Sequence, residues 1–144
     1  VGQMQTLLEN LYKQETTFGE TDFSALCGHL GKHVNKRSFL VLYTNFSNMT
    51  SLNRQLVYLQ QLARQHRVLV VFFEDADLKE YIAGKSVTTE EYYRHVIAEK
   101  FAFEKRLIVS TLKQHGIYSL LTTPDKLSID VINKYLEMKS RQLL

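Results

Sequence analysis

The sequence predicts an α/β fold in which a three-stranded parallel sheet is flanked by helices. Two apolar runs, Phe39–Tyr43 and Arg67–Phe73, are too short for helices and rich in β-branched and aromatic residues, which is typical of strands buried on both faces. A helical pattern separates them, and a strand, a helix and a strand at this spacing form a right-handed βαβ unit with parallel strands. Residues 117–121 form a third, weaker apolar run.

Two helices are expected before the first strand. Apolar residues recur at helical spacing in the first of them, at Met4, Leu7, Leu8 and Leu11. Residues 16–20 form a turn-rich stretch, after which Thr21 or Asp22 caps the second helix. The apolar face of that second helix consists of Phe23, Leu26, Cys27 and Leu30.

Two more helices are predicted on either side of the second strand. The loop at residues 47–51 ends in residues that can cap the first of these helices. A stripe of leucines marks its buried side, at Leu52, Leu56, Leu59 and Leu62. After the second strand, a short helix over residues 78–83 is expected to stop at Gly84.

The longest helix and the last helix complete the predicted order. Thr88 and Glu91 have the spacing of a capping box, and the helix that they open is expected to run to about His115, with Gly116 as its stop. The last helix is expected to be capped near Ser128. Its predicted core-facing residues are Ile132, Tyr135 and Leu136.

Length and composition indicate one globular domain spanning residues 1–144. The chain is 44% apolar and 23% charged, close to globular averages. Its net charge of +3 is not concentrated as a groove-tracking basic patch, so no nucleic-acid partner is expected. The single cysteine excludes an internal disulfide and fits a reducing, intracellular compartment. No apolar stretch is long enough to span a membrane. Because the chain begins without an initiator methionine, we expect it to be part of a longer protein.

Polar residues follow the strands and would line one edge of the sheet. In open α/β sheets the carboxyl ends of the strands form the usual binding crevice, whereas the alternative is the ordinary polarity of surface loops. Glu74 and Asp75 could act as acids, bases or cation ligands, or could cap the next helix; for Asp77 the capping role is favoured. The candidate interaction crevice consists of Thr44, Asn45, Glu74, Asp75, Thr122 and Thr123.

No catalytic, cofactor-binding or metal-binding residue is predicted. His29 and His33 are four residues apart on a helix and could reach one ion, but Cys27 points away from them, so a buried thiol and two exposed histidines are favoured. The chain contains no phosphate-binding G-x-x-x-x-G-K-[ST] loop, no H-E-x-x-H helix and no G-x-S-x-G elbow. The protein is therefore predicted not to be an enzyme.

The longest helix carries aromatic residues on more than one side. Residues around the full circumference of a helix cannot all reach one sheet, so this helix is either buried broadly or faces a partner. The aromatic residues concerned are Tyr92, Tyr93, Phe101 and Phe103.

Two segments carry a family resemblance. Residues 37–46 (RSFLVLYTNF) resemble the strand that ends in Thr-Asp in the bacterial domain-of-unknown-function family fifty-eight, whose fold is like that of the von Willebrand factor A domain. Residues 123–127 (TPDKL) and 131–141 (VINKYLEMKSR) look like the closing helix of that family. The segments between match in order: a helix, a V-L-V-V strand with an acidic tip, and a long helix that begins E-x-Y.

The resemblance implies a Rossmann-like sheet that is the carboxyl-terminal half of an A-like domain. Such domains hold a metal with a D-x-S-x-S loop, a threonine and an aspartate; this chain has no D-x-S-x-S, and Asn45 stands where the family has aspartate, so no metal or cofactor is expected. Family members are often encoded beside MoxR-type AAA+ ATPases, are thought to act in assembly or maturation of protein complexes, and often carry membrane helices upstream.

The resulting hypothesis is a cytoplasmic, non-enzymatic protein-interaction module, whose full-length form is anchored in the inner membrane by upstream helices. Its implied partner is a MoxR-type AAA+ ATPase, and no membrane contact by this segment is expected. The alternative is a ligand-binding or hydrolytic domain that uses the crevice at the strand ends. If the strand at Phe39–Tyr43 lies at the edge of the sheet, we also expect a homodimer or pairing with the missing first half of the domain.

Overall fold

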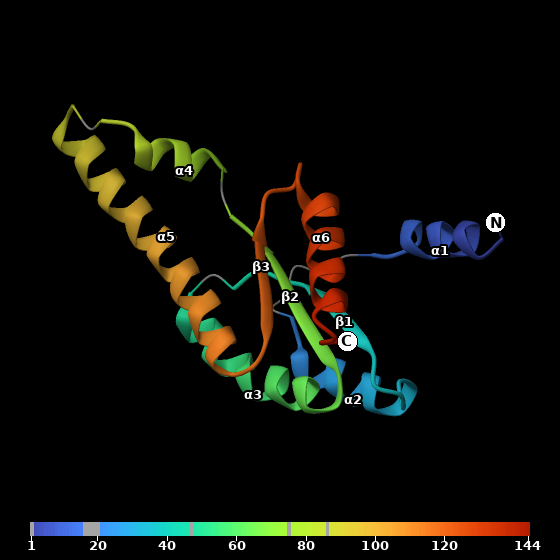
Figure 1. Ribbon diagram of the computed structural model, residues 1–144. Helices are drawn as coiled ribbons and strands as arrows, with labels where there is room; N and C mark the ends of the chain where they lie inside the picture. The colour runs from blue at the N-terminus through green and yellow to red at the C-terminus, as the bar shows by residue number, and fades with distance from the viewer. Residues whose placement is uncertain (1, 16–20, 47, 75, 86) are drawn as a thin grey trace.

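Three parallel strands form one sheet at the centre of the computed structural model, which describes residues 2–15, 21–46, 48–74, 76–85 and 87–144. The strands β1 (Phe39–Tyr43), β2 (Arg67–Phe73) and β3 (Tyr118–Thr122) lie in that order, with β2 in the middle (Figure 1). Both neighbouring pairs are parallel. The predicted α/β, Rossmann-like fold with a three-stranded parallel sheet is confirmed, and its third strand begins one residue later than expected.

The helices of the described residues follow the predicted order along the chain. They are α1 (Gly2–Tyr12), α2 (Phe23–His33), α3 (Met49–Gln65), α4 (Ala76–Ala83), α5 (Thr89–Gln114) and α6 (Leu127–Ser140). The predicted turn-rich stretch at residues 16–20 lies outside the described residues.

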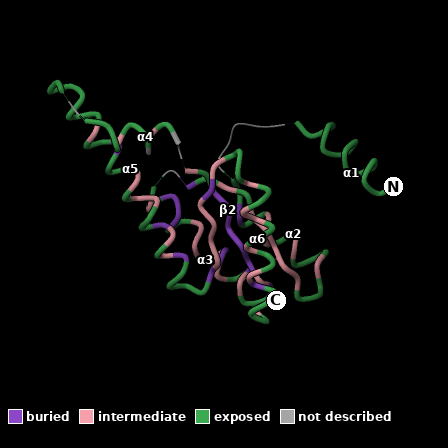
Figure 2. Tube along the Cα trace, turned by 45° about the horizontal axis from the view of Figure 1, so that its top comes forward, coloured by how far each residue is buried: buried purple, intermediate pink, exposed green. Residues whose placement is uncertain are grey.

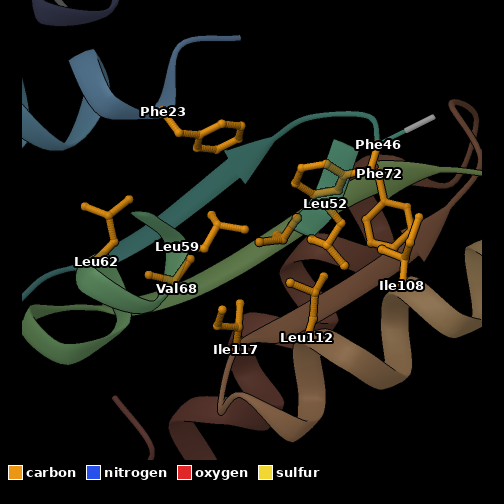
Figure 3. Close-up of a cluster of buried hydrophobic side chains, with 11 residues drawn as sticks. Phe23, Phe46, Leu52, Leu59, Leu62, Val68, Phe72, Ile108, Leu112 and Ile117 are labelled. Carbon is orange, nitrogen blue, oxygen red and sulfur yellow. The ribbon is translucent and has the colours of Figure 1, made fainter. Parts of the chain in front are cut away.

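The main hydrophobic core lies between one face of the sheet and helices α2, α3 and α5. Side chains of β2 alternate between the two faces, so Val68, Val70 and Phe72 enter this core. Figure 3 shows most of the cluster, which combines those strand residues with Phe23, Phe46, Leu52, Leu59, Leu62, Ile108, Leu112 and Ile117. The predicted apolar faces of α2 and α3 are confirmed, because Leu26, Cys27, Leu30 and Leu56 also pack against the cluster.

The opposite face of the sheet is covered by α6. Leu69 and Val71 of β2 point to that face and are fully buried, and Met138 of α6 is buried as well. The ring of Tyr135 lies 5.7 Å from the ring of Phe39, which places α6 over β1 as well as β3. Burial is therefore concentrated along β2, as Figure 2 shows, and the prediction that this strand is buried on both faces is confirmed.

Side chains cap three helices at their amino ends. Asp22 accepts a hydrogen bond from the Ala25 amide at the start of α2, and Asn48 does the same for α3. Thr88 and Glu91 form the predicted capping box of α5. The backbone amides that donate to Glu91 hold the pKa of its carboxyl below the ordinary value. The stability that these hydrogen bonds contribute is therefore fully present above the unfolded-state pKa of Glu91. It is lost as the pH falls through the lowered folded-state pKa of this carboxyl.

Backbone conformation ends the long helix where the sequence predicted. α5 ends at Gln114, and Gly116 has a φ of 72°, in the left-handed region that glycine adopts without a steric penalty. The chain then reverses into β3, because the Ile117 amide donates to the Leu112 carbonyl.

Two predictions for α6 and one for α4 are wrong. α6 is preceded by Lys126 without a side-chain cap rather than being capped near Ser128, and Ile132 and Leu136 are exposed rather than in the core. α6 carries apolar side chains on several sides, and the side with Met138 packs against the sheet. The spacing of apolar residues alone therefore could not identify the core-facing side. Asp77 lies within the first turn of α4 instead of capping it.

Helix α1 is formed as predicted, but its apolar stripe is not covered. Met4, Leu7, Leu8 and Leu11 are each more than half exposed. The helix packs against none of the other helices or strands of the described chain, and Figure 1 shows it standing apart from the sheet.

Candidate functional site

A groove of about 1180 Å³ lies at the carboxyl end of the sheet, between α4 and α5. In Figure 1, α4 and the beginning of α5 extend away from the sheet; we call α4 together with residues 89–103 of α5 the arm. The lining is mainly apolar with a few charged groups, which is the usual composition of a binding site. It consists of Asn45, Phe73, Glu74, Leu78, Ile82, Glu99, Phe101, Ala102, Phe103, Lys105, Arg106 and Leu121.

The structure brings two of the six predicted crevice residues into the groove. Asn45 and Glu74 line it, following β1 and β2 respectively. Thr44 and Thr123 lie at the same edge of the sheet but outside the lining. Asp75 lies outside the described residues.

Thr122, the sixth of these residues, has a structural partner instead. Its side chain is buried, and its hydroxyl donates a hydrogen bond of 2.6 Å to a carboxylate oxygen of Asp130 in α6. The hydroxyl therefore joins the end of β3 to the helix that covers the sheet, and it is not presented to the groove.

Lys105 is one of the groove residues that the sequence did not reveal. Its ammonium donates to the side-chain oxygen of Asn45 at 2.5 Å and to the backbone carbonyl of Phe46 at 3.1 Å. It also lies 5.5 Å from the centre of the Phe72 ring. Burial lowers the pKa of this lysine from its ordinary value.

The hydrogen bond from Lys105 affects what else the side-chain oxygen of Asn45 can bind. The amide oxygen of Asn45 already accepts a hydrogen bond from an ammonium group. A divalent cation bound to the same oxygen would be repelled by that positive charge. The carboxyl end of β1 therefore has a lysine ammonium bound at Asn45.

Charges in the groove lining are balanced in sign. Glu74 and Glu99 oppose Lys105 and Arg106. Glu99 also lies 3.4 Å from the ring of His95, one turn away on α5. Such a lining can hold an apolar segment and orient it with a small number of polar contacts of either sign.

The arm exposes apolar side chains beside the groove. Among the described residues 89–103 of α5, Ala98 is the only buried residue. Phe101 and Phe103 belong to the groove lining and are still 51% and 58% exposed. The other exposed apolar residues of this part of α5 are Tyr92, Tyr93, Val96 and Ile97. The described part of the chain thus does not bury the predicted aromatic residues broadly.

The cysteine and histidine cluster is placed as the sequence indicated. His29 and His33 lie side by side on α2, with ring centres 4.4 Å apart and ring planes tilted by 39°. The Cys27 thiol instead contacts the Tyr58 carbonyl on the core side, and burial raises its pKa. Across the described residues, no group of three or more histidine, cysteine or acidic side chains is arranged to hold a metal ion.

Together the fold and the groove define a class: an α/β domain with a parallel three-stranded sheet and an apolar groove beyond its carboxyl edge. Comparison of the chain with protein-family models, with curated proteins and with solved structures gives no match. None of the helices in the described part of the chain combines the length and apolar character needed to cross a bilayer.

Proposed function

We propose that this chain is a non-enzymatic protein-interaction module that binds its partner through the groove and the arm. The observation that carries the proposal is the concentration of exposed apolar side chains along the arm, next to an apolar groove. A contiguous exposed apolar surface of this kind is typical of a site where another protein docks. An amphipathic helix of the partner that lays its apolar side into the groove would cover both the groove and the apolar side chains of the arm.

The resemblance to the A-like bacterial family supports a choice of partner. It points to a MoxR-type AAA+ ATPase and to work in the assembly or maturation of protein complexes. The same resemblance supports a cytoplasmic location, with upstream helices holding the full-length protein at the inner membrane.

Replacing Phe101 and Phe103 together by aspartate should weaken binding to a MoxR-type AAA+ ATPase encoded in the same genome by about tenfold or more. Both rings line the groove, and a carboxylate at either position would have to be desolvated by an apolar partner. Biolayer interferometry with the immobilised ATPase measures the change.

The matched control places two aspartates at Ile129 and Ile132, which are also more than half exposed but lie on α6. This control should bind like the native chain. Equal losses in both variants, or none in either, would contradict the assignment of the groove. Turnover of a defined substrate that is lost on Glu74→Ala would contradict the non-enzymatic role.

A second candidate function, binding of a small anionic ligand, is favoured by one observation. Lys105 and Arg106 present two cations in the apolar groove, and anions bind to such sites. A ligand bound to the native state raises the unfolding temperature by mass action. In a thermal-shift screen of nucleotides and inorganic phosphate, this candidate requires a reproducible upward shift that disappears in both Lys105→Met and Asn45→Ala. A screen in which no compound raises the unfolding temperature would rule out this second candidate function.

A further inference from the structure

β1 has an outer edge that the rest of the described chain leaves open. The strand is one end of the sheet, and its only neighbour among the helices and strands at backbone contact distance is β2. β3, the opposite end, is flanked by α5 and α6. Edge strands usually carry a charge, a proline or a bulge that prevents pairing with another chain, and the sequence of β1, FLVLY, contains none of these.

The hydrogen bonds to β2 identify which backbone groups face outwards. The Thr44 amide donates to the Val71 carbonyl, and the Ser38 carbonyl accepts from the Arg67 amide. Backbone groups alternate in direction along a strand, so the even-numbered residues of β1 bond to β2. The amide and carbonyl groups of Phe39, Val41 and Tyr43 therefore point to the open edge.

These outward groups are unpaired within the described chain. No hydrogen bond outside the sheet ladders uses the backbone of Phe39, Val41 or Tyr43. Each of these residues offers one donor and one acceptor to an incoming strand. The side chain of Tyr43 is also 60% exposed although it belongs to a sheet strand.

We propose that a second copy of this chain pairs with β1, antiparallel and centred on Val41. In this register, Val41 faces Val41 of the second copy, and Phe39 faces Tyr43 of the second copy. All three outward residues then fall at positions where opposed residues exchange both hydrogen bonds. The two sheets join into one continuous six-stranded sheet, three strands from each copy, with a twofold axis at Val41.

Side chains favour this antiparallel register over a parallel one. Phe39 and Tyr43 lie on the same face of β1, so each ring would pack against an aromatic ring of the second copy. Lys36 and Arg37 precede the strand, and antiparallel pairing places them at opposite ends of the interface. Parallel pairing would set these like charges side by side. A twofold axis along the strands would also place each residue level with its own copy, whereas the hydrogen bonds of a parallel pair need a shift of one residue.

The first test is the mass in solution of the native chain and of Val41→Pro, measured by light scattering during size-exclusion chromatography. The native chain should give twice 16.8 kDa and Val41→Pro should give 16.8 kDa. Proline removes the outward amide and breaks no hydrogen bond to β2, so circular dichroism should be unchanged.

The matched control is Ser119→Pro on β3. The Glu74 amide donates to the Thr122 carbonyl, so the even-numbered residues of β3 bond to β2 and Ser119 faces the outer edge of that strand. This variant should remain a dimer. A monomeric native chain at high concentration would overturn the proposal and leave β1 to a strand from a different polypeptide. A Val41→Pro variant that stays dimeric would overturn it as well.

A charge-swap experiment tests the register and does not depend on proline. Val41→Lys alone and Val41→Glu alone should each be monomeric, because each residue faces its own copy across the twofold axis. An equimolar mixture of the two variants should recover the dimer mass, since lysine then faces glutamate. Failure of the mixture to associate, with both variants folded, would rule out a register centred on Val41. The groove plays no part in this pairing, so the outcome is independent of the proposed function.

Discussion

Replacing Leu112 by alanine is expected to lower the free energy of unfolding by about 3 kcal/mol. Leu112 lies on the sheet-facing side of α5, is fully buried and belongs to the main core cluster. Truncation removes buried methyl groups and leaves a cavity between the helix and the sheet, which the surrounding strands cannot fill without losing their own contacts. Urea denaturation followed by circular dichroism measures the change.

Leu107→Ala provides the control on the same helix. Leu107 is 40% exposed and does not belong to the main core cluster, so this substitution should cost less than about 1 kcal/mol. Similar losses for the two leucines would mean that the sheet-facing side of α5 has been misplaced.

Replacing Thr122 by valine is expected to lower the free energy of unfolding by about 2 kcal/mol, because a hydrogen bond to a charged acceptor is lost. The threonine hydroxyl is buried and bonds to the carboxylate of Asp130, whereas valine has the same shape and no donor. The same denaturation experiment reports the loss, and binding of a groove partner should be unaffected.

Thr44→Val is the matched substitution at the same edge of the sheet. Thr44 is only partly buried, so valine there should change stability by less than about 0.5 kcal/mol. If Thr122→Val proved as mild as Thr44→Val, the bond to Asp130 would not be a stabilising link between β3 and α6.

Features decided by nearby residues could be predicted from the sequence. The unbroken apolar run of β2 indicated a strand buried on both faces, and the Thr88–Glu91 spacing indicated a capping box that closes within one turn. Gly116 was identifiable as a helix stop because glycine accepts the left-handed conformation found there. Each of these patterns carries its own physical reason within a few residues.

Features decided by distant contacts could not be predicted. Lys105 meets Asn45 across sixty positions of the sequence, and in the middle of a charged helix nothing distinguishes it from an ordinary solvated lysine. Thr122 was placed correctly at the strand end, but its bond to Asp130 depends on how α6 folds back over the sheet. The core-facing side of α6 was missed for the same reason, because Ile132 and Met138 are equally apolar and only the packing distinguishes them.

The isolation of α1 has an energetic consequence for anything that binds it. Its 11 residues fall below the roughly 12–15 at which a lone helix becomes stable in water, and no neighbour in the described chain supports it. Ordering this helix costs conformational entropy. The contacts that a partner surface makes with Met4, Leu7 and Leu11 must therefore offset that cost as well as hold the helix. Binding through α1 is thus coupled to its folding, which lowers affinity for each unit of buried area and allows the segment to adapt to differently shaped partners.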